Sequence, residues 1–207
     1  TVSTTIPIYN TGTSYFINTI GNKIYIMNQA YGGIAVIDTI TDTLLTTILL
    51  EAGQQFSAIV GTNLYVLGST TGNVYVIDTI TDTITTTVPV GSTPYYPVIV
   101  GTKLYVTNQD DSTVSVINTA TNTVTATIAV GVGISFSNTI GDKVYIVNGG
   151  DGTVSVIDTT TNGTGGTVVA TIPVGNNPIY PPVTVGTKVY VWNEDDYSFS
   201  VIDSLTN

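Results

Sequence analysis

Three groups of residues in this 207-residue chain have types and spacings that could bind a ligand. The first group is a set of carboxylates gathered on two predicted turns, where hard oxygen ligands could hold Ca²⁺. Its members are Asp110, Asp111, Glu194, Asp195 and Asp196. Their spacing does not match an EF-hand, and a solvated acidic turn that keeps the protein soluble explains the same residues. We therefore expect no bound metal and no cofactor, and keep these five as weak calcium candidates.

The second group consists of aromatic residues that recur near the start of each repeated segment described below. Aromatic faces can stack on sugars or receive a partner's side chain. The alternative is that these rings fill a narrow interior as core, as aromatic residues at internal repeat positions commonly do. The candidate ligand-binding residues are Tyr15, Phe16, Phe56, Tyr95, Tyr96, Phe136 and Tyr180.

The third group is a single glycosylation sequon, Asn162-Gly163-Thr164, in which Asn162 is the candidate acceptor. It lies in an inserted turn that we expect on the exposed outer edge, where an acceptor would have to be. Three-residue matches also arise by chance in a chain rich in Asn and Thr.

The rest of the composition excludes most catalytic chemistry. The chain has no His and no Cys, and its four cations are all Lys, against 14 acidic residues and a net charge of -10. Imidazole and thiolate nucleophiles are therefore absent, and so is a Ser-His-Asp triad. A glycosidase needs two facing carboxyls, but the predicted inner strands carry none. We expect a protein that is not an enzyme, does not bind nucleic acid and does not insert directly into a membrane.

One phrase, Gly-x-Lys/Asn-aliphatic-Tyr-aliphatic, recurs at intervals of about 40 residues. It begins at Gly21, Gly61, Gly101, Gly141 and Gly186. Each copy is followed by a strand-like segment that ends in Asp or Asn and then by a Thr-rich segment. In the third copy the predicted strands are 95–100, 103–108, 113–117 and 124–130. The middle two are apolar on both faces, whereas the last alternates and carries Pro near its end in several copies, which favours an exposed edge strand.

Two residues of the repeat have structural explanations. The tyrosine of the second strand, at Tyr25, Tyr65, Tyr105, Tyr145 and Tyr190, is expected to pack between neighbouring sheets with its hydroxyl satisfied. The Asx residue after the third strand, at Asp38, Asp78, Asn118, Asp158 and Asp203, is expected to accept backbone N–H groups and to fix the turn.

Four-stranded units of this length with a buried middle are typical of β-propeller blades. We predict an all-β, five-bladed β-propeller of four-stranded blades in a single domain, residues 1–207. The blades are expected at about 14–50, 56–90, 95–130, 134–174 and 180–203 plus 1–8. The last blade would be closed by the N-terminal strand, residues 3–8, in a three-plus-one arrangement; the alternative is an open stack or a sandwich. Because the chain starts at Thr1 and its ends meet at one turn of the repeat, we also expect it to be one domain of a larger assembly.

The segment from Leu104 to Gly131 resembles the repeat of the YVTN β-propeller family, above all in 104–108, 112–124 and 127–131. The resemblance extends over all five units, and that family is similar to the propellers of archaeal surface-layer and other secreted proteins. It implies the fold and an extracellular setting, but no particular ligand, because propellers have unrelated functions.

From the residues and this resemblance we expect a non-enzymatic, extracellular structural or interaction module on a cell surface, appendage or virion. Its partners would be a protein or a surface assembly. The alternative is a carbohydrate-binding propeller that uses the aromatic residues at one mouth, with glycans as partners. A glycan-active enzyme is the third and weakest alternative.

Overall fold

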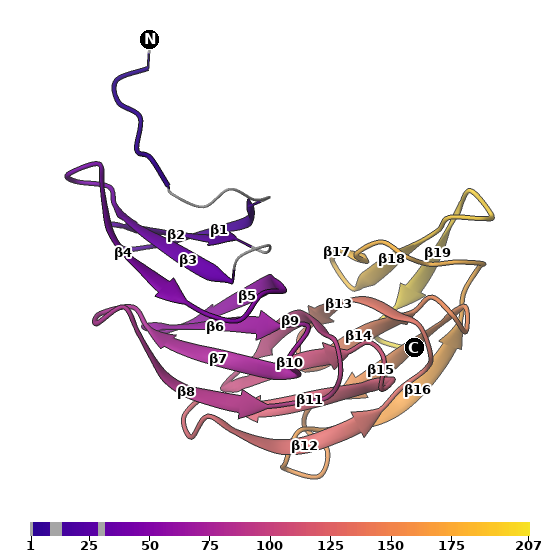
Figure 1. Ribbon diagram of the computed structural model, residues 1–207. Helices are drawn as coiled ribbons and strands as arrows, with labels where there is room; N and C mark the ends of the chain where they lie inside the picture. The colour runs from indigo at the N-terminus through magenta and orange to yellow at the C-terminus, as the bar shows by residue number, and fades with distance from the viewer. Residues whose placement is uncertain (1, 9–13, 29–31) are drawn as a thin grey trace. The chain divides into compact units, whose positions relative to one another are not determined.

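The computed structural model describes residues 2–8, 14–28 and 32–207, without the side chains of 14–16, 54 and 55 (Figure 1). The chain divides into two compact units, Thr1–Val88 and Pro89–Asn207. Every regular element in the described residues is a β-strand, so the all-β prediction is confirmed. Within that part of the chain, no helix is present that could cross a membrane.

The first compact unit contains two antiparallel sheets of four strands, each in sequence order. Their strands are β1 (Ser14–Ile20), β2 (Lys23–Asn28), β3 (Gly33–Asp38), β4 (Thr43–Leu49), β5 (Gln54–Val60), β6 (Asn63–Gly68), β7 (Asn73–Asp78) and β8 (Thr83–Pro89).

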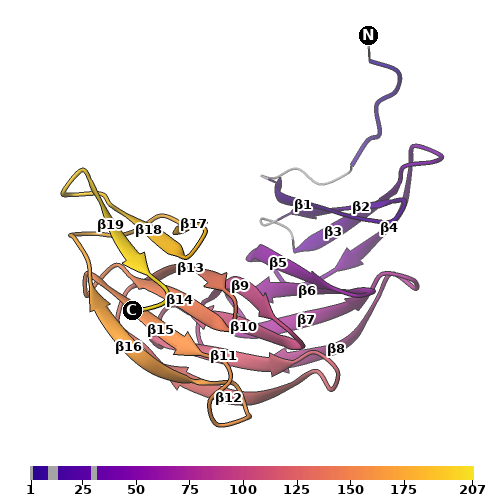
Figure 2. The ribbon, with the colours of Figure 1, turned by 180° about the vertical axis from the view of Figure 1, so that it is seen from behind.

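The second compact unit contains two further sheets of four strands and one of three (Figure 2). The four-stranded sheets are built from β9 (Pro94–Val100), β10 (Lys103–Asn108), β11 (Thr113–Asn118), β12 (Thr123–Ala129), β13 (Ile134–Ile140), β14 (Lys143–Asn148), β15 (Thr153–Asp158) and β16 (Thr167–Pro173). The three-stranded sheet is built from β17 (Val183–Val185), β18 (Lys188–Asn193) and β19 (Ser198–Asp203). All four strands predicted for the third repeat are confirmed, to within one residue at each end.

The second and third strands of a sheet are buried because neighbouring sheets cover their faces. In the first compact unit, Tyr25, Ile34 and Val36 of one sheet form a core with Leu64 and Val66 of the next. Equivalent cores join consecutive sheets of the second compact unit. This stacking explains why these strands are apolar on both faces, since a strand between two sheets has no solvated side.

The fourth strand of each complete sheet is the exposed outer edge. β4, β8, β12 and β16 are the last strands in their sheets, and most of their residues are exposed or half-buried. Thr side chains and the terminal Pro89 and Pro173 suit this edge, because a strand end facing solvent tolerates the missing N–H of proline. The outer-strand prediction is confirmed.

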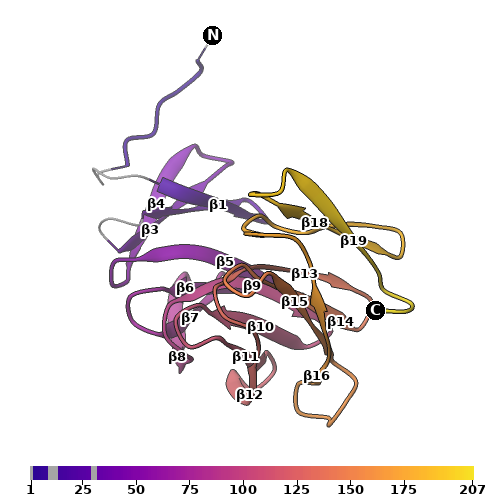
Figure 3. The same ribbon diagram turned by 90° about the vertical axis from the view of Figure 1, so that its right-hand side faces the viewer.

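The last sheet differs from the prediction. It contains β17, β18 and β19 and no fourth strand (Figure 3). Residues 2–8, which the repeat phase assigns to that position, form no strand, and residues 9–13 lie outside the described part of the chain. The four-stranded form of the last blade is therefore not observed, and ring closure stays a prediction.

Candidate functional site

The candidate aromatic residues lie on or beside the first strands of the sheets, as predicted. Tyr95 and Tyr96 are on β9 and Phe136 is on β13, and we call these three the aromatic cluster. The ring centroids of Tyr95 and Phe136 are 5.6 Å apart, and those of Tyr96 and Phe136 are 5.1 Å apart. Interplanar angles of 61° and 77° make both contacts edge-to-face. The three residues are half-buried, and their rings pack on one another.

The remaining aromatic candidates belong to other elements. Phe56 lies on β5 in the first compact unit and is half-buried. Tyr180 precedes β17 and is 49% exposed. Tyr15 and Phe16 belong to β1, but their side chains lie outside the described part of the structure. Within the second compact unit, the structure brings Tyr95, Tyr96 and Phe136 together.

The acidic turns, which join the second and third strands of the sheets, bind neighbouring backbone. Asp111 accepts a hydrogen bond from the backbone N–H of Ser92 at 2.7 Å. The corresponding Asp196 accepts from the N–H of Asn176, also at 2.7 Å. Asp151 accepts from the N–H of Val132 at 2.8 Å. In three successive sheets, the carboxylate at the equivalent position therefore binds the loop that precedes the first strand.

The other calcium candidates are also bonded to protein donors. Asp110 accepts from the Thr93 hydroxyl, and Asp195 accepts from the Asn177 amide at 3.1 Å. Glu194 accepts from the indole N–H of Trp192 at 2.6 Å. Among residues 2–8, 14–28 and 32–207, no three acidic groups come together in a way that could hold a metal ion.

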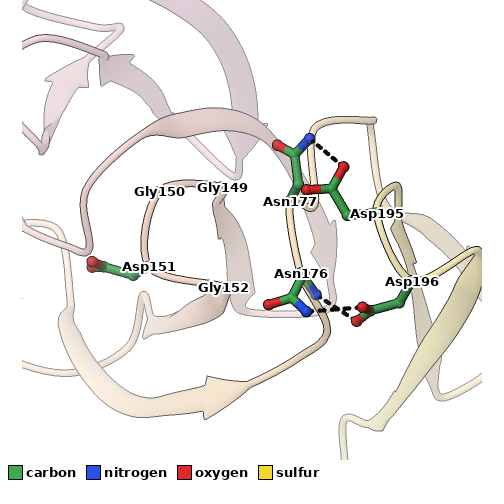
Figure 4. Close-up of a pocket in the computed structure, with 8 residues that line it drawn as sticks. All are labelled: Gly149, Gly150, Asp151, Gly152, Asn176, Asn177, Asp195 and Asp196. Atoms are coloured by element: carbon green, nitrogen blue, oxygen red, sulfur yellow. Dashed lines mark hydrogen bonds between the residues drawn. The ribbon is translucent and has the colours of Figure 1, made fainter.

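A polar hollow of about 470 Å³ lies between two of the acidic turns. It is lined by residues 149–152 of one turn and by Asn176, Asn177, Asp195 and Asp196 (Figure 4). The Asp151 carboxylate points away from those of Asp195 and Asp196 in this view. The backbone and side-chain amides of Asn176 lower the pKa of the Asp196 carboxyl, which therefore stays ionised as an acceptor for this loop.

Asn162 lies in a turn in which both the oxygen and the nitrogen of its carboxamide make hydrogen bonds. Its φ is 54°, and its carboxamide oxygen accepts from the N–H of Thr164 at 3.1 Å and from the Thr164 hydroxyl at 3.0 Å. The carboxamide nitrogen donates to the carbonyl of Gly166 at 3.0 Å. Attachment of a glycan at this nitrogen would compete with that bond, so any glycosylation is expected before the turn folds.

The last hairpin carries an exposed aromatic group that sequence reasoning missed. The rings of Trp192 and Phe199 are 4.9 Å apart, and Phe199 is 60% exposed. Tyr197, in the turn between them, is 84% exposed. The signal was present, because Trp192 is the only Trp of the chain and the other repeats have non-aromatic residues at the positions of Trp192 and Phe199.

Replacement of Asp111 tests whether the acidic turns are structural. We expect Asp111→Ala to lower the free energy of unfolding by about 1 kcal/mol, because the Ser92 N–H loses its acceptor. Urea titration followed by circular dichroism measures the change. Glu51→Ala, at an exposed site without a hydrogen bond to its side chain in the described residues, is the matched control and should stay within about 0.5 kcal/mol of wild type. A rise in the melting temperature on adding Ca²⁺ would contradict this explanation.

Comparisons with known proteins identify the fold. The structure of the computationally designed Ika8 protein matches with a TM-score of 0.80 at 16% identity, over 97% of this chain and 61% of that one. BamB from Moraxella catarrhalis matches with a TM-score of 0.68 at 16% identity, over 98% of this chain and 61% of that one. A functionally unknown protein from Desulfotomaculum acetoxidans matches with a TM-score of 0.70 at 12% identity, over 95% of this chain and 71% of that one.

These likenesses and the repeated four-stranded antiparallel sheets define a repeat protein with a β-propeller type of fold. The chain spans about three fifths of the length of the designed protein and of BamB. No protein-family model and no curated protein matches the sequence. Identities this low carry information about the fold and not about the activity.

Proposed function

We propose that this chain is a non-enzymatic extracellular interaction module, displayed on a cell surface, appendage or virion. In this proposal it is a YVTN-repeat β-propeller of five blades, and residues 3–8 complete the last blade as its outer strand. A closed ring of stacked sheets is rigid and has no long exposed edge, which suits a domain that meets proteases outside a cell.

The observation that best supports a binding rather than a catalytic function is the use of the polar side chains. Carboxylates that could act as acids or bases, such as Asp111, Asp151 and Asp196, accept hydrogen bonds from backbone amides. A carboxylate held in this way is a fixed acceptor for the fold, whereas a general acid or base has to reach its substrate. Recognition then depends on the loops and on exposed side chains.

Surface display can be tested on the intact source of the protein. Antibodies against the purified chain should label whole cells or particles, and added protease should reach the chain without lysis. Labelling that appears only after lysis would contradict the extracellular proposal.

Carbohydrate binding is a second candidate, and the aromatic cluster favours it. Tyr95, Tyr96 and Phe136 present half-buried rings from two neighbouring first strands, and aromatic faces stack on sugar rings.

A glycan array probed with the labelled chain, with calcium and with a chelator, distinguishes the two candidates. If the cluster binds sugars, selective signals should appear and should fall at least about tenfold in Tyr95→Ala, as expected for the loss of a stacking contact of about 1.4 kcal/mol. Tyr197→Ala, which removes an exposed ring outside the cluster, is the control and should leave them unchanged. Equal, weak binding to every glycan would remove the carbohydrate candidate and leave the protein-binding module.

A further inference from the structure

The outer strands of the four complete sheets differ in the residue that ends each strand. β8 ends in Pro89 and β16 ends in Pro173, whereas β4 ends in Leu49. A proline has no backbone N–H, so it protects an edge strand against pairing with a further strand. The outer edge of β4 lacks this protection.

The residue that ends β4 points its backbone polar groups away from its own sheet. At the end of the β3–β4 ladder, the carbonyl of Gly32 accepts a hydrogen bond from the N–H of Leu50. Hydrogen-bonded and non-hydrogen-bonded pairs alternate along an antiparallel ladder. The N–H groups of Leu49 and Thr47 therefore point outward from the edge of the sheet.

The same alternation places a proline at an outward position of β16. The carbonyl of Gly152 accepts a hydrogen bond from the N–H of Val174 at 2.9 Å, and Pro173 is the residue before Val174. The proline thus removes one of the outward donors of β16. Pro89 ends β8 at the equivalent position.

The outer strand β12 is protected in a different way. It ends in Ala129, which keeps its N–H, but the inserted turn of the next sheet lies against the strand. The Thr125 hydroxyl donates to the carbonyl of Thr164 in that turn at 2.6 Å. The turn is also bound by Tyr105, which donates to the carbonyl of Gly165 at 2.8 Å. A covering loop is a second means by which β proteins protect an edge strand.

β4 has neither form of protection within its compact unit. Among residues 2–8, 14–28 and 32–88, none outside its own sheet makes a hydrogen bond to β4. Leu45 is 46% exposed and Leu49 is 78% exposed, whereas β12 has Thr125 and Ala129 at these positions. An unpaired edge with exposed apolar side chains is suited to take up a further strand.

Acidic residues flank this edge at both ends. Asp42 immediately precedes β4 and Glu51 lies just after it, and both are exposed. A second copy of β4 in antiparallel register would bring Asp42 of one chain beside Glu51 of the other, and like charges on paired strands are destabilising. An extended segment with a basic residue at each end complements both carboxylates.

We propose that the outer edge of β4 binds an extended segment of a partner protein as an added strand, and that this segment has a basic residue at each end. The N–H groups of Thr47 and Leu49 supply backbone hydrogen bonds to it. Asp42 and Glu51 set its charge preference. This inference rests on the proposed interaction module and names a surface at which its partner binds.

Hydrogen exchange with a defined peptide tests the edge. The probe is the peptide Lys-Val-Thr-Val-Thr-Val-Lys, and Glu-Val-Thr-Val-Thr-Val-Glu is the matched acidic peptide. The amides of Thr47 and Leu49 should exchange rapidly in the free protein and slowly with the basic peptide. Slow exchange without peptide would show that the edge is already covered and would overturn the proposal. Exchange that the basic peptide leaves unchanged would overturn it as well.

Two substitutions copy the ends of the other outer strands into β4. Leu49→Pro, which reproduces the ends of β8 and β16, should weaken binding of the basic peptide at least about tenfold, because the outward N–H is lost. Leu49→Ala, which reproduces the end of β12, keeps this N–H and should lose less affinity. Urea midpoints close to that of wild type would show that both variants fold. Wild-type affinity in folded Leu49→Pro would overturn the proposal.

Charge variants test the choice of partner without altering the backbone of the edge. The wild-type chain should prefer the basic peptide, and the double variant Asp42→Asn with Glu51→Gln should bind the two peptides equally. Asn suits position 42, where φ is 53°, because Asn122 has a φ of 54° at the equivalent position of another turn. Equal binding of the two peptides to the wild-type chain would overturn the proposed basic partner.

These experiments separate failure of the edge from failure of the proposed function. Unchanged exchange with both peptides, together with antibody labelling of whole cells, would overturn the β4 edge and leave surface display standing. Peptide binding at β4 without such labelling would overturn the extracellular setting and leave the edge standing.

Discussion

Tyr105→Ala should lower the free energy of unfolding by about 3–5 kcal/mol, as large-to-small changes of aromatic residues in a core do. Tyr105 is fully buried in a core with Val144 and Ile146 of the following sheet. Its hydroxyl donates to the carbonyl of Gly165 at 2.8 Å. The substitution therefore leaves a cavity between two sheets and removes a hydrogen bond from one sheet to a turn of the next. Urea unfolding followed by tryptophan fluorescence and circular dichroism gives the value.

Two variants separate packing from hydrogen bonding at this position. Tyr105→Phe keeps the ring and should cost about 1 kcal/mol, because only the bond to Gly165 is lost. Tyr180→Ala, at a site that is 49% exposed, should stay within about 1 kcal/mol of wild type. Equal losses in Tyr105→Ala and Tyr180→Ala would show that the repeated tyrosine is not a packing residue.

Alkaline pH should destabilise the folded protein through its buried tyrosines. Burial raises the pKa of the repeated second-strand tyrosines above the usual 10.0, for Tyr105 to about 12. Tyr25, Tyr65 and Tyr145 shift in the same direction, and burial is the largest cause at each. At Tyr25 the hydrogen bond to the Asp82 carboxylate adds to the rise.

The sign of the effect follows from proton linkage. The unfolded chain releases these protons near pH 10 while the folded chain still holds them, so stability is complete below about pH 10 and falls as the pH rises toward 12. Each such tyrosine contributes a slope of about 1.4 kcal/mol per pH unit. Urea midpoints measured from about pH 9 to about pH 12 record the loss.

A matched pair of variants checks that buried tyrosines cause this loss. Tyr105→Phe should be less stable at neutral pH but should show a shallower alkaline slope, because one linked group is gone. Tyr145→Phe should make the slope shallower in the same way, because burial also raises the pKa of Tyr145. A wild-type stability that stays constant over the same interval would contradict the explanation.

The repeat made the local structure predictable. The third unit's strands were predicted to within one residue, because turn residues at fixed offsets bound each apolar segment. The role of the Asx residues was also predictable: Asp38 and Asp78 each accept from the N–H two residues later at 2.7 Å. We expected the hydroxyl of each repeated tyrosine to have a hydrogen-bond partner. The particular acceptors were not predictable, since they lie more than fifty residues away in the sequence.

The candidate site was less predictable than the strands. The acidic turns look like metal ligands in the sequence because adjacent carboxylates share a turn. Only the folded chain shows that Asp111 and Asp196 turn toward the loop that precedes the first strand of their own sheet. The Trp192–Phe199 pair became notable only with its exposure, which depends on what covers the sheet and not on the hairpin itself.

The sequence by itself determined a repeated four-stranded antiparallel unit, its turns, its exposed outer strand and its buried tyrosine, because each depends on periodicity and on neighbours within or next to one unit. The tertiary structure decided which donors meet which acceptors between sheets and how the turn carboxylates are used. Those outcomes depend on contacts between segments far apart in the chain. A pattern that is repeated in every unit does not say which of these segments meet.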